Sequence, residues 1–489
     1  MAAQQHATAS RSVLGSSTIC LLAFLLLLSS HPLSAQKVDP DTVTLPSTQT
    51  NAVSTNQAPI FSDFDSTNLP SLSTNVFQST VLPVPRPYAE SPAATIGTGR
   101  LASPLYGTSA LTGPSANVPI PASLPGLWQA GDVSLRAILS ETMIYGNGLE
   151  YAPGNQTSTF VSEFTPAVVF NAGRNWVLNY APTFYDYASS KFHDDVAQSE
   201  SIVGSAAYQD WRFGMAQSYA DSSQPLVETG EQTSSQVTTA MVTAARQMGD
   251  QLSFDVGLNW THRVTPGFDN IDTWSGGPAL FYSPIQQVSF NLNFNGGYDL
   301  ISVGSDIVYE SLEAGITFRP REKLTLSLSG GAQDMQFVNP SAPALLSPIF
   351  NASLQYKATA TTLIGVTASE TVTPSFFANQ IITSKSVAAS IQQQLSPKFS
   401  LSLAGSYSSE PYTSIEVAPL PQFYLGIPPV SVLETVRSDT FETLNVRLTY
   451  LFSSRITASI FYTLSENASG QGNFKYTSLQ EGLSLSYVF

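Results

Sequence analysis

The sequence predicts an all-β protein, a transmembrane antiparallel up-and-down β-barrel of about 18 strands that follows a disordered N-terminal lead. Three observations predict this fold. Beyond Gly131, the segments alternate apolar with small polar residues. The connections between these segments are alternately short and long. Only 11% of the residues are charged, against about 25% in an ordinary soluble domain.

The N-terminus has the pattern of a secretory signal peptide. Arg11 precedes an uninterrupted apolar run at 19–28, and small residues ending at Ala35 supply a cleavage site. The run is far shorter than the ~20 residues that a membrane helix needs. We therefore expect residues 1–35 to be removed on export. The one cysteine, Cys20, lies in this segment, so no disulfide, thiol or cysteine metal site is expected in the mature chain.

Residues 36–131 form a lead that is rich in Pro, Ser and Thr. They show neither helical nor strand periodicity, and Pro83, Pro85 and Pro87 would interrupt a sheet ladder. We expect an extended or disordered periplasmic segment. Two hypotheses stay open for it: a linker outside the barrel, or a length of chain threaded into the lumen.

Residues 132–489 carry the barrel pattern. In 288–294 (VSFNLNF), the apolar side chains share one face, and Ser289, Asn291 and Asn293 share the other. Strict alternation of this kind predicts a strand with one apolar and one polar face. The same pattern returns at 323–329, 399–403, 444–450 and 483–489.

The connections predict the strand number. Short turns are expected at 172–175, 209–210, 247–250, 283–286, 319–322, 359–362, 395–398 and 452–455. Longer polar loops are expected at 146–156, 189–195, 222–232, 264–270, 299–305, 336–348, 374–379, 410–436 and 467–474. An even strand number with short turns at one end and long loops at the other is typical of bacterial outer-membrane barrels. Both termini would then lie on the periplasmic side.

A soluble β-sandwich or β-solenoid is the alternative fold. A solenoid would show a tighter repeat, and a sandwich would carry more surface charge. The apolar faces of 18 strands are also too many to fill the interior of one soluble barrel, so they are expected to meet lipid. Aromatic residues near the short turns support a membrane interface there. They are Phe170, Trp176, Tyr208, Trp211, Phe281, Tyr282, Phe318, Phe399 and Phe452.

The last residues resemble the C-terminal assembly signal of outer-membrane barrels. The chain ends on Phe489, preceded by Tyr487 and Leu485 on the same face and by Gly482 further back. The resemblance implies insertion by the outer-membrane barrel assembly machinery.

A broader resemblance covers 132–489. The tract 176–187 (WVLNYAPTFYDY) resembles the early hairpin of β-barrel porin families found beside exopolysaccharide genes. This resemblance implies an integral outer-membrane barrel, with the lipid bilayer as a partner, and leaves its cargo open.

Several function classes are excluded or unsupported. A net charge of −15 would repel nucleic acid. The sequence has no nucleotide-binding loop, no HExxH motif and no metal-ligand spacing, so we expect no cofactor, no metal and no enzyme activity. An outer-membrane hydrolase is a third hypothesis, with His193, Asp194, Asp195 and His262 as its candidates at the outer rim. These four are expected to be ordinary solvated charges.

Strand alternation assigns six charged residues to the lumen, because a charge at mid-membrane on the lipid face costs about 2–4 kcal/mol. They are Arg136, Glu163, Arg212, Glu313, Lys357 and Arg447. We expect these residues to line a water-filled pore and tune its ion preference. The alternative is that inward Arg–Glu pairs only hold the wall together.

The sequence thus predicts a porin-like channel for passive passage of small polar solutes or saccharides. A non-conducting structural or adhesin-like barrel is the second hypothesis, with the loop 410–436 as its contact surface. That loop carries Tyr412, Phe423 and Tyr424, together with Pro419, Pro421, Pro428 and Pro429. It would fold inward as a constriction under the first hypothesis and project outward under the second.

Overall fold

The computed structural model describes residues 128–147, 158–173, 175–225, 232–321, 323–338, 344–377, 379–417 and 431–489. All of them belong to one of two compact units, Ser66–Phe489. The predicted signal peptide and the predicted lead up to residue 127 lie outside the described residues. Within the described ranges, no helix is long and apolar enough to cross a membrane.

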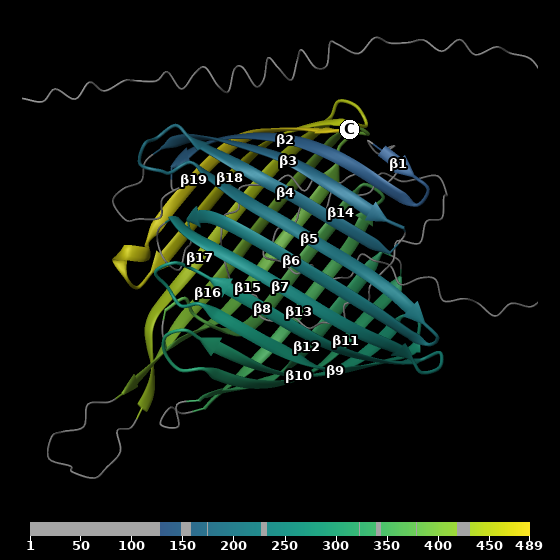
Figure 1. Ribbon diagram of the computed structural model, residues 1–489, viewed down its shortest axis with the longest axis vertical. Helices are drawn as coiled ribbons and strands as arrows, with labels where there is room; N and C mark the ends of the chain where they lie inside the picture. Colours follow the sequence, from purple (N-terminus) through teal and green to yellow (C-terminus); the bar gives the residue numbers. More distant parts are fainter. Residues whose placement is uncertain are drawn as a thin grey trace, which may run out of the picture. The chain divides into compact units, whose positions relative to one another are not determined.

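The described strands form one antiparallel sheet that closes on itself (Figure 1). Strands β2 to β19 pair with their chain neighbours, and β19 pairs with β2. This closed barrel of 18 strands confirms the predicted fold. The strands are β1 (Trp128–Ala130), β2 (Val133–Asn147), β3 (Thr159–Ala172), β4 (Trp176–Tyr187), β5 (Asp195–Tyr208), β6 (Trp211–Pro225), β7 (Gln232–Gln247), β8 (Leu252–Val264), β9 (Ile271–Ile285), β10 (Val288–Ile301), β11 (Ile307–Arg321), β12 (Leu324–Phe337), β13 (Leu345–Thr359), β14 (Thr362–Pro374), β15 (Gln380–Gln394), β16 (Phe399–Val417), β17 (Ser431–Leu451), β18 (Ile456–Ser469) and β19 (Tyr476–Val488).

The connections define two rims. We call the end with the brief connections and Phe489 the short-turn rim, and the opposite end the long-loop rim. The predicted turns fall at the observed connections with one exception. Strand β16 runs to Val417 and β17 starts at Ser431, so 410–436 is mostly strand, and only 418–430 connect the two. Tyr412 was therefore wrongly predicted to lie in a loop; it pairs with Arg437 in the sheet ladder.

The two faces of the wall differ as predicted. On β12, Leu326 and Leu328 are 41% and 51% exposed on the outer face, whereas Ser327 and Ser329 turn inward and are buried. The same alternation runs through the other strands, where exposed Leu, Ile, Val and Phe side chains face out. An outer apolar band with a polar interior is the pattern of a barrel that meets lipid.

Aromatic side chains mark both edges of the apolar band. Near the short-turn rim, exposed outward rings include Tyr282, Phe318, Tyr356, Phe399 and Phe452. A second belt, which the sequence did not predict, lies toward the long-loop rim and includes Tyr145, Trp274, Tyr407 and Tyr462. Two such belts correspond to the two interfaces of a membrane.

Several carboxylates face outward, among them Glu141 in the apolar band and Glu442 and Glu481 nearer the long-loop rim. Glu141 lies at the middle of β2 and pairs with the outward Phe164. Its Oε1 accepts a hydrogen bond of 2.5 Å from the Ser162 hydroxyl on β3. This bond partly offsets the cost of placing a carboxylate on the lipid side.

The seam of the barrel is shared by two segments. Along one edge of β2, β19 pairs down to Ile138, and the Phe489 amide donates to the Ala137 carbonyl at 3.0 Å. Strand β1 then pairs with residues 133–135 of the same edge. Strand β1 therefore covers the part of the β2 edge that lies beyond the end of β19. In Figure 1, β1 lies beside the C-terminus.

Gly482 of the predicted assembly signal is needed for packing inside the barrel. It faces inward, whereas Leu485 and Tyr487 face outward. A Cβ at Gly482 would lie 2.2 Å from Cζ of Phe461 and 2.7 Å from the Met143 carbonyl oxygen. Phe461 is buried in a cluster with Ile144, Val161, Tyr187 and Phe192.

We predict that Gly482→Ala destabilises the barrel by about 1–3 kcal/mol, because the added methyl overpacks this cluster. Urea unfolding of the detergent-folded protein measures the effect. In the Phe461→Ala background, Gly482→Ala should cost less than it does in the wild type, since only the contact with the Met143 carbonyl remains. Additive destabilisation by the two changes would contradict this account.

Candidate functional site

The long-loop end of the β14–β15 hairpin leaves the barrel wall. Pairing between β13 and β14 ends at Phe350 and Glu370, although β14 continues to Pro374 and stays paired with β15. We call residues 371–382 the hairpin tip. Within it, Val372 and Ile381 are fully buried against Ile307, Tyr309, Met335 and Phe337. Those side chains lie on the inner face of β11 and β12. The hairpin tip is therefore folded into the lumen.

Arg263 holds the hairpin tip from the other side. This residue is at the end of β8 and is 1% exposed. Its Nη2 donates to the Ser375 carbonyl at 3.2 Å, and its guanidinium carbon lies 3.9 Å from the centre of the Phe376 ring. The Asp269 amide donates to the Phe376 carbonyl at 3.2 Å. A buried guanidinium over an aromatic ring, with a carbonyl acceptor, is a strong local anchor.

Two loops complete this anchor. Phe268 packs edge-on against Phe376 and Phe377, with ring centres 6.2 and 5.5 Å apart. In the next loop, the Ser305 amide donates to Oδ1 of Asn379 at 3.0 Å. The hairpin tip thus crosses from β14 to the β8–β9 and β10–β11 loops and narrows the long-loop half of the lumen.

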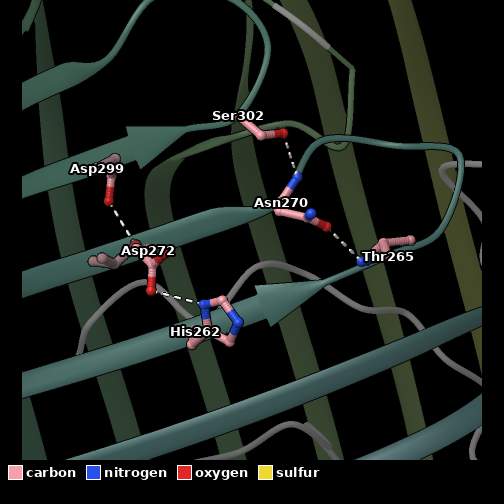
Figure 2. A network of polar contacts seen from close by, with 7 residues as sticks. His262, Thr265, Asn270, Asp272, Asp299 and Ser302 are labelled. Carbon is pink, nitrogen blue, oxygen red and sulfur yellow. Dashed lines mark hydrogen bonds and ion pairs between the residues drawn. The ribbon is translucent and has the colours of Figure 1, made fainter.

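The β8–β9 loop is itself braced by side chains. Asn270 Oδ1 accepts a hydrogen bond from the Thr265 backbone N–H at 3.1 Å (Figure 2). The backbone N–H of Asn270 donates to the Ser302 hydroxyl at 3.0 Å. On the inner face below, the Thr273 hydroxyl donates to Asp299 at 2.6 Å. These bonds fix the loop that carries Phe268 and Asp269.

A second group of inward side chains fills the same half of the lumen near β16–β19. The Arg437 guanidinium lies between the rings of Tyr412 and Phe474, at 3.7 and 3.9 Å. Its Nε is 3.1 Å from Oδ2 of Asp439. Across the seam, Phe192 of the β4–β5 loop stacks on Tyr187 at 5.2 Å. These aromatic faces are buried, so they are not available for stacking on a sugar ring.

Alternation places all six predicted charged residues on the inner face: Arg136 on β2, Glu163 on β3, Arg212 on β6, Glu313 on β11, Lys357 on β13 and Arg447 on β17. Glu163 is buried, whereas Arg212 and Lys357 are exposed. The Arg447 guanidinium contacts the Ser459 hydroxyl at 3.4 Å. Their part in conduction stays a prediction.

The sequence analysis missed several inward charges. Strand alternation would have found Asp255. Asp299, Arg319 and Glu410 were hidden because they lie in connections predicted at 299–305, 319–322 and 410–436. Arg437 and Asp439 lie just beyond the predicted loop 410–436, at the start of the alternation that it displaced. Arg263 lies between outward His262 and Val264, but only the fold shows that it reaches the hairpin tip.

The hydrolase candidates have structural roles. His262 faces outward beside the aromatic belt of the long-loop rim, and its Nδ1 lies 2.7 Å from Oδ1 of Asp272 (Figure 2). Its ring stacks on that of Trp260, with ring centres 6.0 Å apart. None of the hydrogen bonds among the described residues joins His262 to a hydroxyl that would serve as a nucleophile. Asp194 accepts the Tyr187 amide at 2.9 Å and closes the β4–β5 loop.

A family comparison agrees with this architecture. Residues 305–488, from the β10–β11 connection to the end of β19, match the family model described as "Putative beta-barrel porin 2". The chain is a porin-like outer-membrane β-barrel. Strands β1 to β10 of this porin-like barrel lie outside the family match, and none of the curated proteins compared with it matches.

Solved structures with a similar fold are distant in sequence. Pseudomonas aeruginosa OpdL and OccK8 (OprE) are 12% and 9% identical, with TM-scores of 0.39 and 0.38. These matches cover 74% and 73% of the porin-like barrel and 99% and 98% of the two solved chains. The siderophore receptor PirA from the same organism is 8% identical, with a TM-score of 0.36, and the match covers 72% of this chain and 80% of that one. Such distant matches carry no argument about solutes.

We predict that Arg263→Ala releases the hairpin tip, because it removes the bond to Ser375 and the contact with the Phe376 ring. Losing a charge-assisted bond and a desolvated ring contact should speed amide hydrogen exchange in the tip by about 10-fold or more. Arg246→Ala is the matched control. Arg246 likewise lies near an aromatic ring, that of Trp211, but at the short-turn rim. Equal tip protection in wild type and Arg263→Ala would contradict the anchor.

Acid should favour the docked hairpin tip. Burial raises the pKa of the Asp269 carboxyl above its ordinary value, and Arg263 opposes this rise. A carboxyl whose pKa is higher in the docked state of the hairpin tip binds its proton more tightly in that state, so protonation favours docking. This contribution to docking is lost as the pH rises through the pKa of the docked state. Tip exchange, corrected for its intrinsic pH dependence, should slow from neutral pH toward about pH 4. Asp269→Asn should remove most of this dependence; an unchanged profile in the variant would assign it to another group.

Proposed function

We propose that the protein is a passive diffusion channel for small polar solutes, with the hairpin tip as its constriction. The observation that carries this proposal is the docked tip itself, anchored by Arg263 within the long-loop half of the lumen. In a wide barrel, the cross-section of the lumen that its loops leave open determines which solutes pass. An inward segment with fixed anchors sets that cross-section. The short-turn rim would face the periplasm, as the connection lengths favour.

The lumen wall supports passage of hydrated solutes. Inward side chains at mid-barrel include exposed Asn351, Gln355 and Thr367. Such groups replace part of a solute's hydration shell without binding it tightly, so no energy input or cofactor is needed. Short saccharides remain among the candidate solutes, although the buried aromatic clusters argue against a stacking path for them.

A non-conducting structural barrel is the second candidate. It is favoured by the dense packing around Arg437 and Phe192, both nearly inaccessible in the long-loop half. The predicted contact surface at 410–436 is reduced to 418–430, which lie outside the described residues.

We predict stable single-channel steps in planar bilayers for the chain without residues 1–35. A second form that also lacks 36–127 tests the lead while keeping β1 at the seam. Steps in both forms would make the lead a linker, and steps only in the shorter form would make it a plug. Silence from both, with heat-modifiable migration on gels showing a folded barrel, would contradict the channel and favour the structural barrel.

A further inference from the structure

The charges inside the barrel are divided along its axis. Five inward cations lie within five residues of the short-turn end of their strands: Arg136 on β2, Arg212 on β6, Arg319 on β11, Lys357 on β13 and Arg447 on β17. We call these five residues the cationic ring. Among the described inward side chains at that level, one is a carboxylate, Asp255 on β8. It interacts electrostatically with Arg212.

The other half of the lumen has the opposite balance. Inward acids near the long-loop rim are Glu163, Asp195, Asp299, Glu410 and Asp439. The two inward arginines there are both taken into packing. Arg263 is 1% exposed against Phe376, and Arg437 is 6% exposed between two rings. The accessible positive charge of the described lumen therefore lies at the short-turn end.

The cationic ring surrounds the path rather than lining one side. Its members come from strands spaced around the whole sheet order, and no two of them are on adjacent strands. Arg212 and Lys357 are exposed, and the other three are half-buried. Positive side chains spread around a pore act together on an ion near the axis.

The expected field is large enough to select ions at low salt. With a strand spacing of ~4.8 Å and a tilt of ~40°, 18 strands give a backbone radius of about 18 Å, so the charges lie about 12 Å from the axis. Four net charges at that distance, in water at ~0.1 M salt, concentrate a univalent anion about twofold and deplete a cation equally. The permeability ratio of anion to cation should therefore be about 4.

We propose that the cationic ring makes this barrel selective for small anionic solutes, such as carboxylates, phosphates or acidic sugars. The ring attracts an anion at the short-turn end of the lumen, where the side chains of Arg212 and Lys357 are exposed to water. This inference rests on the proposed channel function and names the solute class of that channel.

The first test is the reversal potential across a salt gradient of about 0.1 M against 0.02 M KCl. The wild type should prefer chloride about fourfold, and the preference should fade toward 1 at ~1 M salt, where the screening length is ~3 Å. Arg212→Gln, Arg319→Gln and Lys357→Gln together should bring the ratio close to 1. Changing the two arginines to lysine instead should keep it. Arg246→Gln is the matched control, because Arg246 is outside the barrel near the same rim, 3.6 Å from Asp210.

The second test measures the same field without conduction. A cysteine is placed at Gln355, which is inward and exposed on β13, in a chain whose Cys20 has been removed with the signal peptide. Its reaction rate with an anionic methanethiosulfonate, relative to a cationic one, should fall about threefold in the triple variant, which removes three of the four net charges. A cysteine at Ser199, inward on β5 in the acidic half, should be nearly unaffected by the triple variant.

The outcomes separate the two proposals. Conduction without chloride preference, or with a preference that the triple variant leaves unchanged, would overturn the anion selectivity and leave the channel standing. Silent bilayers with a charge-dependent cysteine rate would overturn the channel while retaining an anion-attracting chamber. A cysteine rate that is insensitive to reagent charge would overturn the cationic ring in either case.

Discussion

The hydrogen-bond ladder between β19 and β2 is the interaction on which the rest of the molecule depends. It runs from Leu479 opposite Asn147 to Val488 opposite Ile138, with β1 continuing along the same edge. In lipid, each unpaired backbone group costs several kcal/mol, so an open edge would not persist. Closure with 18 strands then sets a lumen too wide for wall side chains alone to fill. What occupies that lumen in the described part of the chain comes from connections and strand ends.

Among the described residues, the segments that fill the lumen lie at the long-loop end. In the long-loop half, the hairpin tip, Phe192 and Phe474 all turn inward, and two arginines are desolvated against aromatic rings. Each arginine also has an oxygen partner, the Ser375 carbonyl for Arg263 and Asp439 for Arg437. Such partners offset the loss of hydration that burial imposes on a guanidinium. The short-turn half has no comparable inward segment among the described residues, and Arg212 and Lys357 stay exposed there.

Local patterns were enough to predict the wall, because a strand needs only alternation and a turn only a few residues. Parity alone placed Arg136 and Glu163 on the inner face. The hairpin tip was beyond such reasoning. Residues 371–374 alternate like any strand end, and their departure from β13 depends on Arg263, six strands away along the wall. The strand extension around Tyr412 was missed for a similar reason: its ladder with β17 and its packing on Arg437 outweigh the loop-like composition nearby.

In the proposed channel, the two halves of the lumen would act in series on a solute. The packed long-loop segment would discriminate by size, because the hairpin tip and the buried Arg263 and Arg437 narrow the opening there. A wider hydrated segment with separated like charges discriminates by sign, since its field extends about one screening length into the water. Size and charge selection are thus assigned to different parts of one wall. The hairpin tip can therefore move without disturbing the cationic ring, because the two share no described contact.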